Sequence, residues 1–101
     1  MIAEVIVDIA NSKLDKIFDY KITTQDVFLG SRVIVPFGNR KIEGYVIKIK
    51  ETSSFEYSKL KSILRAVDNI PILTNEFIDL ANFMHDKYHV SMASILRLFL
   101  P

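Results

Sequence analysis

The sequence contains no cysteine, so its 101 residues can form neither a disulfide framework nor a zinc site with thiolate ligands. Long apolar runs are also missing, and no segment approaches the ~18 consecutive apolar residues that a membrane-spanning helix needs. The first residues lack a basic stretch and carry an acid at Glu4, which does not fit a secretory signal peptide. Runs of like charge are short, which argues against disorder. These absences leave a folded domain that is compatible with a cytosolic protein.

What is present fits one compact domain over residues 1–101, because 50% of the residues are hydrophobic and 25% are charged. The formal net charge is only +1. Residues 1–65 hold eleven basic and eight acidic side chains, whereas the remainder holds two and four, so the first part is +3 and the rest is −2. A mildly basic part can face a phosphate backbone, but an ordinary solvated surface explains the same charge.

Four segments in the first part have the pattern of strands. Residues 2–9 alternate, and 17–21, 32–35 and 41–50 are further apolar stretches bounded by turn residues. On the first strand, Ala3, Val5, Val7 and Ile9 share one face, and Glu4 and Asp8 the other.

Proline and glycine mark the boundaries of the later strands. We expect Pro36 to end the third strand because proline has no N–H to donate to a sheet. The turn Gly38-Asn39-Arg40 follows. Both faces of the strand over 41–50 are partly apolar, which favours a small barrel over an open one-sided sheet. These faces carry Tyr45, Ile47 and Ile49 on one side and Ile42, Gly44 and Val46 on the other.

The later part changes to a helical period. Residues 60–67 fit either a helix or a strand, and we favour a short final strand. Thr74 is a suitable N-cap for one helix and Ser91 for a second. The first helix is expected to carry Phe77, Ile78, Ala81, Met84 and Tyr88 on its apolar stripe, and the second Met92, Ile95, Leu96 and Phe99. The predicted fold class is therefore α+β, with a barrel-like β part over 1–67 and two helices within 71–100. Since the chain ends on an apolar segment, we expect a larger protein to continue beyond it.

The segment Phe18-Asp19-Tyr20 places an acid between two aromatic rings at the start of a strand. The carboxylate can accept a hydrogen bond from a sugar hydroxyl, and the rings can pack against a base or a ribose. In the alternative interpretation, Phe18 and Tyr20 are alternating core residues and Asp19 is a surface acid.

Two further positions have a binding and a structural interpretation. Gly38 lets a backbone approach a ligand closely, or simply permits a positive φ in the turn. Lys61 pairs with a phosphate, or is a solvated charge. The glycines do not form a phosphate-binding P-loop, because no Gly-Lys-Ser/Thr follows.

Enzymatic and metal sites have little support. His85 and His89 stand four residues apart on a predicted helix, but the zinc-protease signature and a third ligand are missing. We expect both rings near a helix C-terminus instead. No Ser-His-acid arrangement or spaced carboxylate pair suggests catalysis. The residues alone therefore indicate a small non-enzymatic domain that could bind a polyanion.

Taken together, the segments resemble the N-terminal domain of the PriA (primosomal protein N-prime) helicase family. The match runs through Phe18-Asp19-Tyr20 and then through Gly30, Arg32-Val33 and Val35-Pro36-Phe37-Gly38. It begins at Val5-Ile6-Val7-Asp8-Ile9 and continues through Gly44-Tyr45-Val46, Leu60-Lys61, Val67-Asp68, Pro71-Ile72-Leu73, Leu80-Ala81, Tyr88 and Leu100-Pro101. It thus covers nearly the whole chain. The segment over 11–17 departs from the family, which is often proline-rich there.

The resemblance implies a module that binds the 3′-terminal nucleotide of the nascent leading strand at stalled forks, without base selectivity. It places the pocket on Phe18, Asp19, Gly38 and Lys61. Asp19 would accept a hydrogen bond from the terminal ribose hydroxyl, Phe18 would hold the base, Gly38 would admit the backbone, and Lys61 would lie beside a phosphate.

The resemblance also implies that the parent protein is an ATP-dependent 3′-to-5′ DNA helicase that acts in replication restart. ATP, magnesium and zinc would belong to other parts of that protein, and no cofactor or metal is expected in this fragment. The implied partners are DNA and, further, other primosome proteins and single-stranded-DNA-binding protein, in the bacterial cytoplasm at the nucleoid. The alternative function is a scaffold that docks onto helicase lobes or replisome partners through Phe77, Phe83, Met84 and Phe99.

Overall fold

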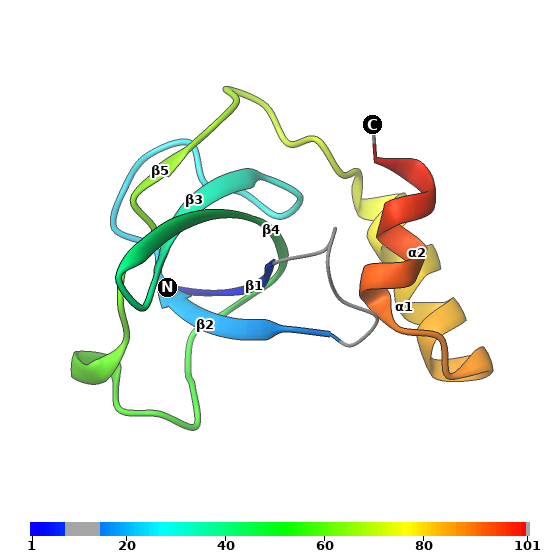
Figure 1. Ribbon diagram of the computed structural model, residues 1–101, viewed down its shortest axis with the longest axis horizontal. Helices are drawn as coiled ribbons and strands as arrows, with labels where there is room; N and C mark the ends of the chain where they lie inside the picture. The colour runs from blue at the N-terminus through cyan, green and yellow to red at the C-terminus, as the bar shows by residue number, and fades with distance from the viewer. Residues whose placement is uncertain (8–14, 101) are drawn as a thin grey trace.

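The computed structural model describes residues 1–7 and 15–100, with strands first and helices second (Figure 1). The strands are β1 (Ile2–Val7), β2 (Ile17–Lys21), β3 (Arg32–Phe37), β4 (Arg40–Lys50) and β5 (Arg65–Ala66). A short 3-10 turn, η2 (Tyr57–Lys59), precedes β5, and the helices α1 (Asn75–Tyr88) and α2 (Met92–Phe99) follow it. The predicted α+β class is confirmed.

The strands form one antiparallel sheet in the order β2-β1-β4-β3-β5. Strand pairing alone does not close it, but the chain between η2 and β5 reaches both sides of the gap. Lys21 N–H donates to Lys61 O (2.9 Å), and Ile63 N–H donates to Lys21 O (3.0 Å). On the other side, Leu64 N–H donates to Ile34 O (2.9 Å). These bonds join the edge strand β2 to the β3–β5 side, so the sheet curls into a barrel-like shape (Figure 1).

Small aliphatic side chains fill the interior of the curled sheet. Tyr20 is buried there, and its hydroxyl donates to Pro36 O (2.8 Å). Burial raises the pKa of this hydroxyl, so the ring stays neutral in its apolar surroundings. The interior cluster consists of Ala3, Val5, Val7, Tyr20, Val27, Val33, Val35, Val46 and Ile63.

A second cluster joins the outer face of the sheet to the helices, which lie beside the β part in Figure 1. Ile6 of β1 and Ile47 of β4 belong to one buried cluster with residues of both helices. The cluster is completed by Leu73, Ile78, Ala81, Met92, Ala93, Ile95 and Leu96. Because β1 and β4 contribute to both clusters, the helical part and the barrel-like part share one structural unit.

Both helices begin where the sequence predicts. Thr74 Oγ1 accepts a hydrogen bond from Phe77 N–H (3.1 Å) at the start of α1, as an N-cap does. Ser91 Oγ accepts from Ser94 N–H (3.1 Å) at the start of α2. The Asp15 carboxylate adds two acceptors, for the N–H groups of residues 92 (3.1 Å) and 93 (2.8 Å). A carboxylate at a helix N-terminus also complements the helix dipole. Asp15 therefore connects the segment that precedes β2 to the start of α2.

Gly30 joins the β part to the segment before the helices. Its N–H donates to Val46 O (2.8 Å), and its carbonyl accepts from the N–H groups of Ile72 and Leu73 (3.0 Å each). Its φ is +89°, and a Cβ placed on it would lie 1.9 Å from Leu73 O. Only glycine fits both this φ and this close approach of two backbone segments.

Two predicted strand boundaries differ from the structure. The prediction that Pro36 ends its strand is wrong, because β3 runs on to Phe37 and Pro36 pairs with Lys41. Among the described residues, no strand pairs with the other side of β3 at Pro36, since β5 pairs only with Val33 and Ile34. The missing N–H of Pro36 therefore costs no ladder bond there. The predicted final strand within 60–67 exists, but it is only the two-residue β5. For the strand over 2–9, β1 covers 2–7, and the last two residues lie outside the described part.

The predicted distribution of side chains between the two faces of β4 is also partly wrong. The pairing of β1 with β4 shifts between Glu4↔Lys48 and Val5↔Val46, so Ile47 is an extra residue, a β-bulge. Ile47 faces the helices, but Ile49 packs against the interior cluster instead of sharing that face. Beyond a bulge, the side chains that would point inward point outward, and the reverse. A sequence pattern with a strict period of two does not predict this change of face.

The buried apolar stripe on the two helices is narrower than predicted. Ile78 and Ala81 are buried, and Phe77 and Met84 pack at the edge of the cluster, but Tyr88 is 58% exposed. Phe99 is exposed as well, although its ring meets that of Phe77 edge to face at 4.8 Å. Within the described residues, neither helix has the length and apolar character to cross a membrane.

Candidate nucleic-acid interface

A pocket of about 600 Å³ opens between β2 and the segment through η2. The η2 segment lies on the side of the β part that is turned away from the helices (Figure 1). Such a volume lies within the ~300–1,000 Å³ typical of small-molecule sites. Its walls come from β1, β2, the end of β4 and the loop through η2. They are formed by Glu4, Ile17, Phe18, Asp19, Tyr20, Lys50, Ser54, Phe55, Lys59, Leu60 and Lys61. Three of the four site residues predicted from the sequence, Phe18, Asp19 and Lys61, are therefore brought together.

Strand alternation sends Phe18 and Asp19 to opposite faces of β2. Asp19 of β2 is the register partner of Glu4 of β1. Both side chains project from the outer face of the sheet, because their neighbours Tyr20, Ala3 and Val5 point inward. The Asp19 side chain is only 11% exposed. It is thus a largely shielded acid that lines a pocket, and the interpretation of Asp19 as a freely solvated surface acid does not describe it.

The Asp19 carboxylate is held through one of its two oxygens. Its Oδ2 lies 3.0 Å from Lys50 Nζ and accepts a hydrogen bond from the Ser53 hydroxyl. Within the described residues, Oδ1 has no hydrogen-bond donor, and it is not buried, because the described part contains no buried side-chain oxygen without a partner. An ionised carboxylate offers about four acceptor positions. Asp19 is therefore oriented by the protein and still able to accept a hydrogen bond from a ligand.

Lys50 binds two acids at once. Its Nζ lies 3.0 Å from Glu4 Oε2 and 3.0 Å from Asp19 Oδ2. Burial by itself lowers the pKa of this ammonium, but the hydrogen bonds to both carboxylates outweigh it and the pKa is raised. The bulge at Ile47 makes this contact possible, because without it strict alternation would turn Lys50 to the inside with Val46.

Phe18 lines the pocket from β2 and is partly exposed. Its ring is 41% exposed and meets the Phe37 ring edge to face, with centroids 5.3 Å apart. Tyr20, two residues on, is 4% exposed. The core interpretation therefore holds for Tyr20, whereas Phe18 keeps a large part of its ring available to a ligand.

Lys61 reaches the pocket from the segment that runs along the edge of β2. Its backbone carbonyl is fixed by Lys21 N–H, and its side chain is exposed. Next to it, Lys21 Nζ lies 4.8 Å from the centre of the Tyr57 ring, a cation–π distance. Lys59 also lines the pocket, and its Nζ lies 3.9 Å from the Glu56 carboxylate in an exposed pair. Cations therefore stand along the pocket's outer edge.

Gly38, the fourth predicted site residue, does not line the pocket. It occupies the tight turn between β3 and β4, with a φ of +60°, and a Cβ built on it would meet no described atom within 4 Å. Its neighbour Phe37 touches Phe18, which does line the pocket. Gly38 thus lies outside the pocket, next to the residue that contacts Phe18, and a side chain at this position would face open space.

Several pocket residues were missed by sequence reasoning. Phe55 lines the pocket from a polar loop without a regular period, and Ser53 of the same loop donates to Asp19 without lining the pocket. Glu4 and Lys50 line the pocket from strands whose apolar pattern indicates only a core. The one available signal was the position of Glu4 on the polar face of its strand. The strand register, which sets Glu4 opposite Asp19, is not visible in a single sequence.

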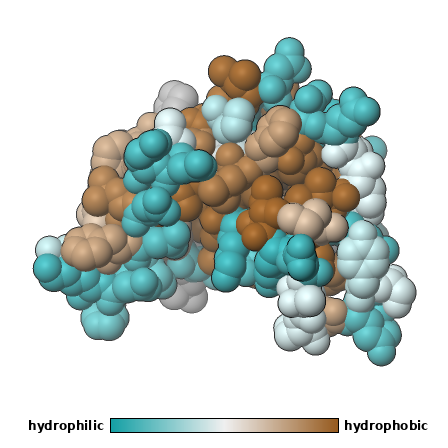
Figure 2. All heavy atoms as spheres, turned by 180° about the vertical axis from the view of Figure 1, so that it is seen from behind, coloured by the Kyte–Doolittle hydropathy of each residue, from teal (hydrophilic) through white to brown (hydrophobic). Residues whose placement is uncertain are grey.

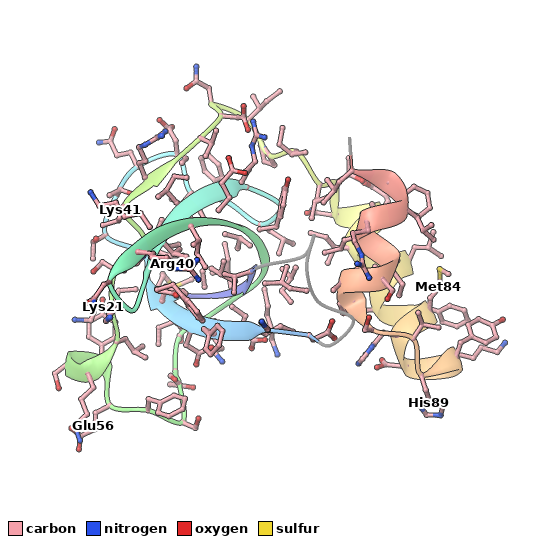
Figure 3. The ribbon with its side chains drawn as sticks, viewed as in Figure 1. Lys21, Arg40, Lys41, Glu56, Met84 and His89 are labelled. Carbon is pink, nitrogen blue, oxygen red and sulfur yellow. The ribbon has the colours of Figure 1, made fainter. Side chains whose placement is uncertain are left out.

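The two histidines belong to the end of α1, far from the pocket. A ring nitrogen of His85 lies 2.7 Å from Val90 O, and His89 is the C-cap with a φ of +56°. Figure 3 shows His89 and Met84 on the helical side, and Lys21, Arg40 and Lys41 on the β side. In the described residues, no three potential ligand side chains gather as a metal site would require.

Comparison with known proteins adds a family to this geometry. A family model described as the PriA 3′DNA-binding domain (3′BD) matches residues 4–101. Replication restart protein PriA from Bacillus subtilis (strain 168) is 39% identical over 102 residues, which is 98% of this chain and 13% of the relative. PriA from Haemophilus influenzae is 33% identical over 90 residues, 87% of this chain and 12% of the relative.

A probable replication restart protein PriA from Mycobacterium tuberculosis is 32% identical over 91 residues, 87% of this chain and 14% of the relative. The chain spans about an eighth of the length of these relatives. The match with the family model extends over both the sheet and the helices. This chain belongs to the PriA 3′DNA-binding domain family.

Proposed function

We propose that this domain binds the 3′-terminal nucleotide of a DNA strand without selecting the base. The observation that carries the proposal is the Asp19 carboxylate, which is held by Lys50 and Ser53 at a pocket of about 600 Å³ and whose Oδ1 has no partner among the described residues. The 3′ oxygen of an internal nucleotide is esterified and cannot donate a hydrogen bond. A terminal 3′-hydroxyl can donate, so the pocket distinguishes an end from an internal stretch.

The other residues that line the pocket suit a nucleotide with any base. Phe18 and Phe55 offer exposed ring faces, and every base has a π-face that stacks on such rings. Lys61 and Lys59 are placed to contact the phosphate that links the terminal nucleotide to the rest of the strand. The cations Lys21, Arg40 and Lys41 lie on the same β side (Figure 3) and extend the favourable field for a polyanion.

In the whole protein, we propose that this binding serves a PriA-type helicase at stalled forks, where the ligand is the 3′ end of the nascent leading strand. Catalysis, with ATP and magnesium, and zinc binding belong to other parts of such a protein. Its further partners would be other primosome proteins and single-stranded-DNA-binding protein, and its location the bacterial cytoplasm, at the nucleoid.

A second candidate function is docking onto protein partners through the helices. Viewed from behind, hydrophobic atoms form a broad area among hydrophilic groups (Figure 2). On the helices, Leu80, Phe83, Leu98 and Phe99 are each about half exposed or more. Of the residues predicted for such a surface, Phe77 and Met84 instead pack against the core. None of the four exposed residues lines the pocket, so the two functions are compatible.

A titration tests the proposed function. The domain is mixed with a short fluorescent strand that has a free 3′-hydroxyl, with the same strand ending in a 2′,3′-dideoxynucleotide, and with a circular strand of the same composition. We expect the dideoxy and circular strands to bind roughly tenfold more weakly, because each lacks a hydrogen bond of about 1.5 kcal/mol to a charged acceptor. Equal anisotropy curves for all three strands would rule out end recognition.

A further inference from the structure

Three charged side chains from neighbouring strands meet on the wall of the pocket. Glu4 of β1 and Asp19 of β2 are register partners, and both lie 3.0 Å from Lys50 Nζ at the end of β4. The two carboxylate oxygens are therefore no farther apart than twice that distance. Their formal charge with Lys50 is −1.

This group is shielded from solvent more than an ordinary surface pair. The exposed fractions are 23% for Glu4, 25% for Lys50 and 11% for Asp19. Salt and water screen such charges less effectively than they screen fully exposed ones. The remaining pocket cations, Lys59 and Lys61, are exposed and come from the η2 segment and the residues that follow it.

The two chemical forms of a strand end meet this group differently. A 3′-hydroxyl is neutral and donates a hydrogen bond to Asp19 Oδ1. A 3′-phosphate carries close to two negative charges at neutral pH and offers acceptor oxygens. Lys50 has one positive charge, and both carboxylates already share it. A phosphate in this place would thus meet two like charges and one cation that is already engaged.

We propose, resting on the proposed function, that Glu4 is a specificity-determining residue: its charge makes the pocket accept a 3′-hydroxyl end and exclude a 3′-phosphate end. Asp19 alone would not achieve this, because the Asp19–Lys50 pair is neutral and Lys50 would be free to turn toward a phosphate. The second acid occupies Lys50 and leaves the group negative.

The experiment compares two linear ligands on four proteins, with a circular strand of the same composition as the reference that has no end. One decanucleotide is prepared with a 3′-hydroxyl and with a 3′-phosphate, and the ratio of the two affinities is measured for the wild type, Glu4→Gln, Glu4→Asp and Glu43→Gln. Glu4→Gln removes the charge but keeps an oxygen that accepts from Lys50. Glu43, exposed on β4 and outside the pocket, is the matched control for loss of one glutamate charge.

We expect Glu4→Gln to lower the hydroxyl-to-phosphate ratio about tenfold, equivalent to ~1.4 kcal/mol. Glu4→Asp retains the charge and should keep most of the preference, and Glu43→Gln should match the wild type. An unchanged ratio in folded Glu4→Gln, in a domain that still prefers a free end over a circular strand, overturns the role of Glu4 and leaves the proposed function standing. If the wild type shows no preference even over a circular strand, both fail. Glu4→Asp keeps the role of charge testable if Glu4→Gln does not fold, since a wild-type ratio supports the proposal and a collapsed ratio opposes it.

Discussion

Replacing Asp19 with alanine is expected to weaken binding to a free 3′ end by roughly ten- to a hundred-fold. A hydrogen bond to a charged acceptor contributes about 1.5–3 kcal/mol, and each ~1.4 kcal/mol is tenfold in affinity. Binding to a circular strand should change little, since that ligand has no terminal hydroxyl. Anisotropy titrations of both ligands give the two affinities.

The same substitution has a structural consequence that must be separated from binding. Asp19→Ala removes one of the two partners of Lys50, but Glu4 remains 3.0 Å from that ammonium, so no charge is left without a partner. We therefore expect a folded variant, checked by its thermal unfolding midpoint. Asp79→Ala, an exposed acid on α1, is the control for loss of one negative charge. A folded Asp19→Ala domain that binds free ends like the wild type would show that Asp19 is not the recognition group.

Replacing Gly30 with alanine is expected to cause the largest loss of stability. The new Cβ would lie 1.9 Å from Leu73 O, and the φ of +89° is strained for any side chain. Relief requires the two backbone segments to separate, which breaks the hydrogen bonds of Gly30 with Ile72 and Leu73. We expect a loss on the order of 4 kcal/mol in the free energy of unfolding, measured by urea titration.

Gly38→Ala is the matched control for this prediction. Gly38 also has a positive φ, +60°, but a Cβ there would meet nothing within 4 Å. Only the backbone strain applies, and it costs about 1–2 kcal/mol. Similar losses for the two variants would mean that the contact between Gly30 and Leu73 does not hold the β part to the helical part.

Local signals in the sequence determine much of this fold. The N-caps Thr74 and Ser91 and the buried positions Ile78, Ile95 and Leu96 follow from capping chemistry and a 3.6-residue period, and the structure confirms them. These features depend on residues a few positions apart, so one sequence contains the necessary information.

Features that depend on distant pairing could not be predicted. The bulge at Ile47 turns Lys50 to the face where Asp19 lies, and nothing between residues 41 and 50 indicates it. Ser53 enters the site because its loop folds back over β2. The extension of β3 through Pro36 depends on the shortness of β5 beside it. In each case, the local sequence allows more than one strand boundary, register or loop position, and pairing with distant residues determines which one forms.

The sequence indicates residues that line the pocket, but it does not indicate the neighbouring groups that orient Asp19. Phe18, Asp19 and Lys61 line one pocket, whereas Gly38 stands outside it, in the turn next to Phe37. The groups that orient Asp19 come from β1, β4 and the loop after β4. Motif resemblance points to residues that would touch a ligand, but the neighbours that set their charge and orientation emerge only from the register.

Recognition of a terminal 3′-hydroxyl by Asp19 can be tested by nuclear magnetic resonance mapping of a dinucleotide with a free 3′-hydroxyl onto the isotope-labelled domain. We expect amide shifts to concentrate on residues 17–21 and 50–61, around the Asp19 carboxylate, and to vanish when the dinucleotide ends in a dideoxy sugar. Shifts concentrated on α1 and α2, or unchanged by loss of the hydroxyl, would contradict this mode of recognition.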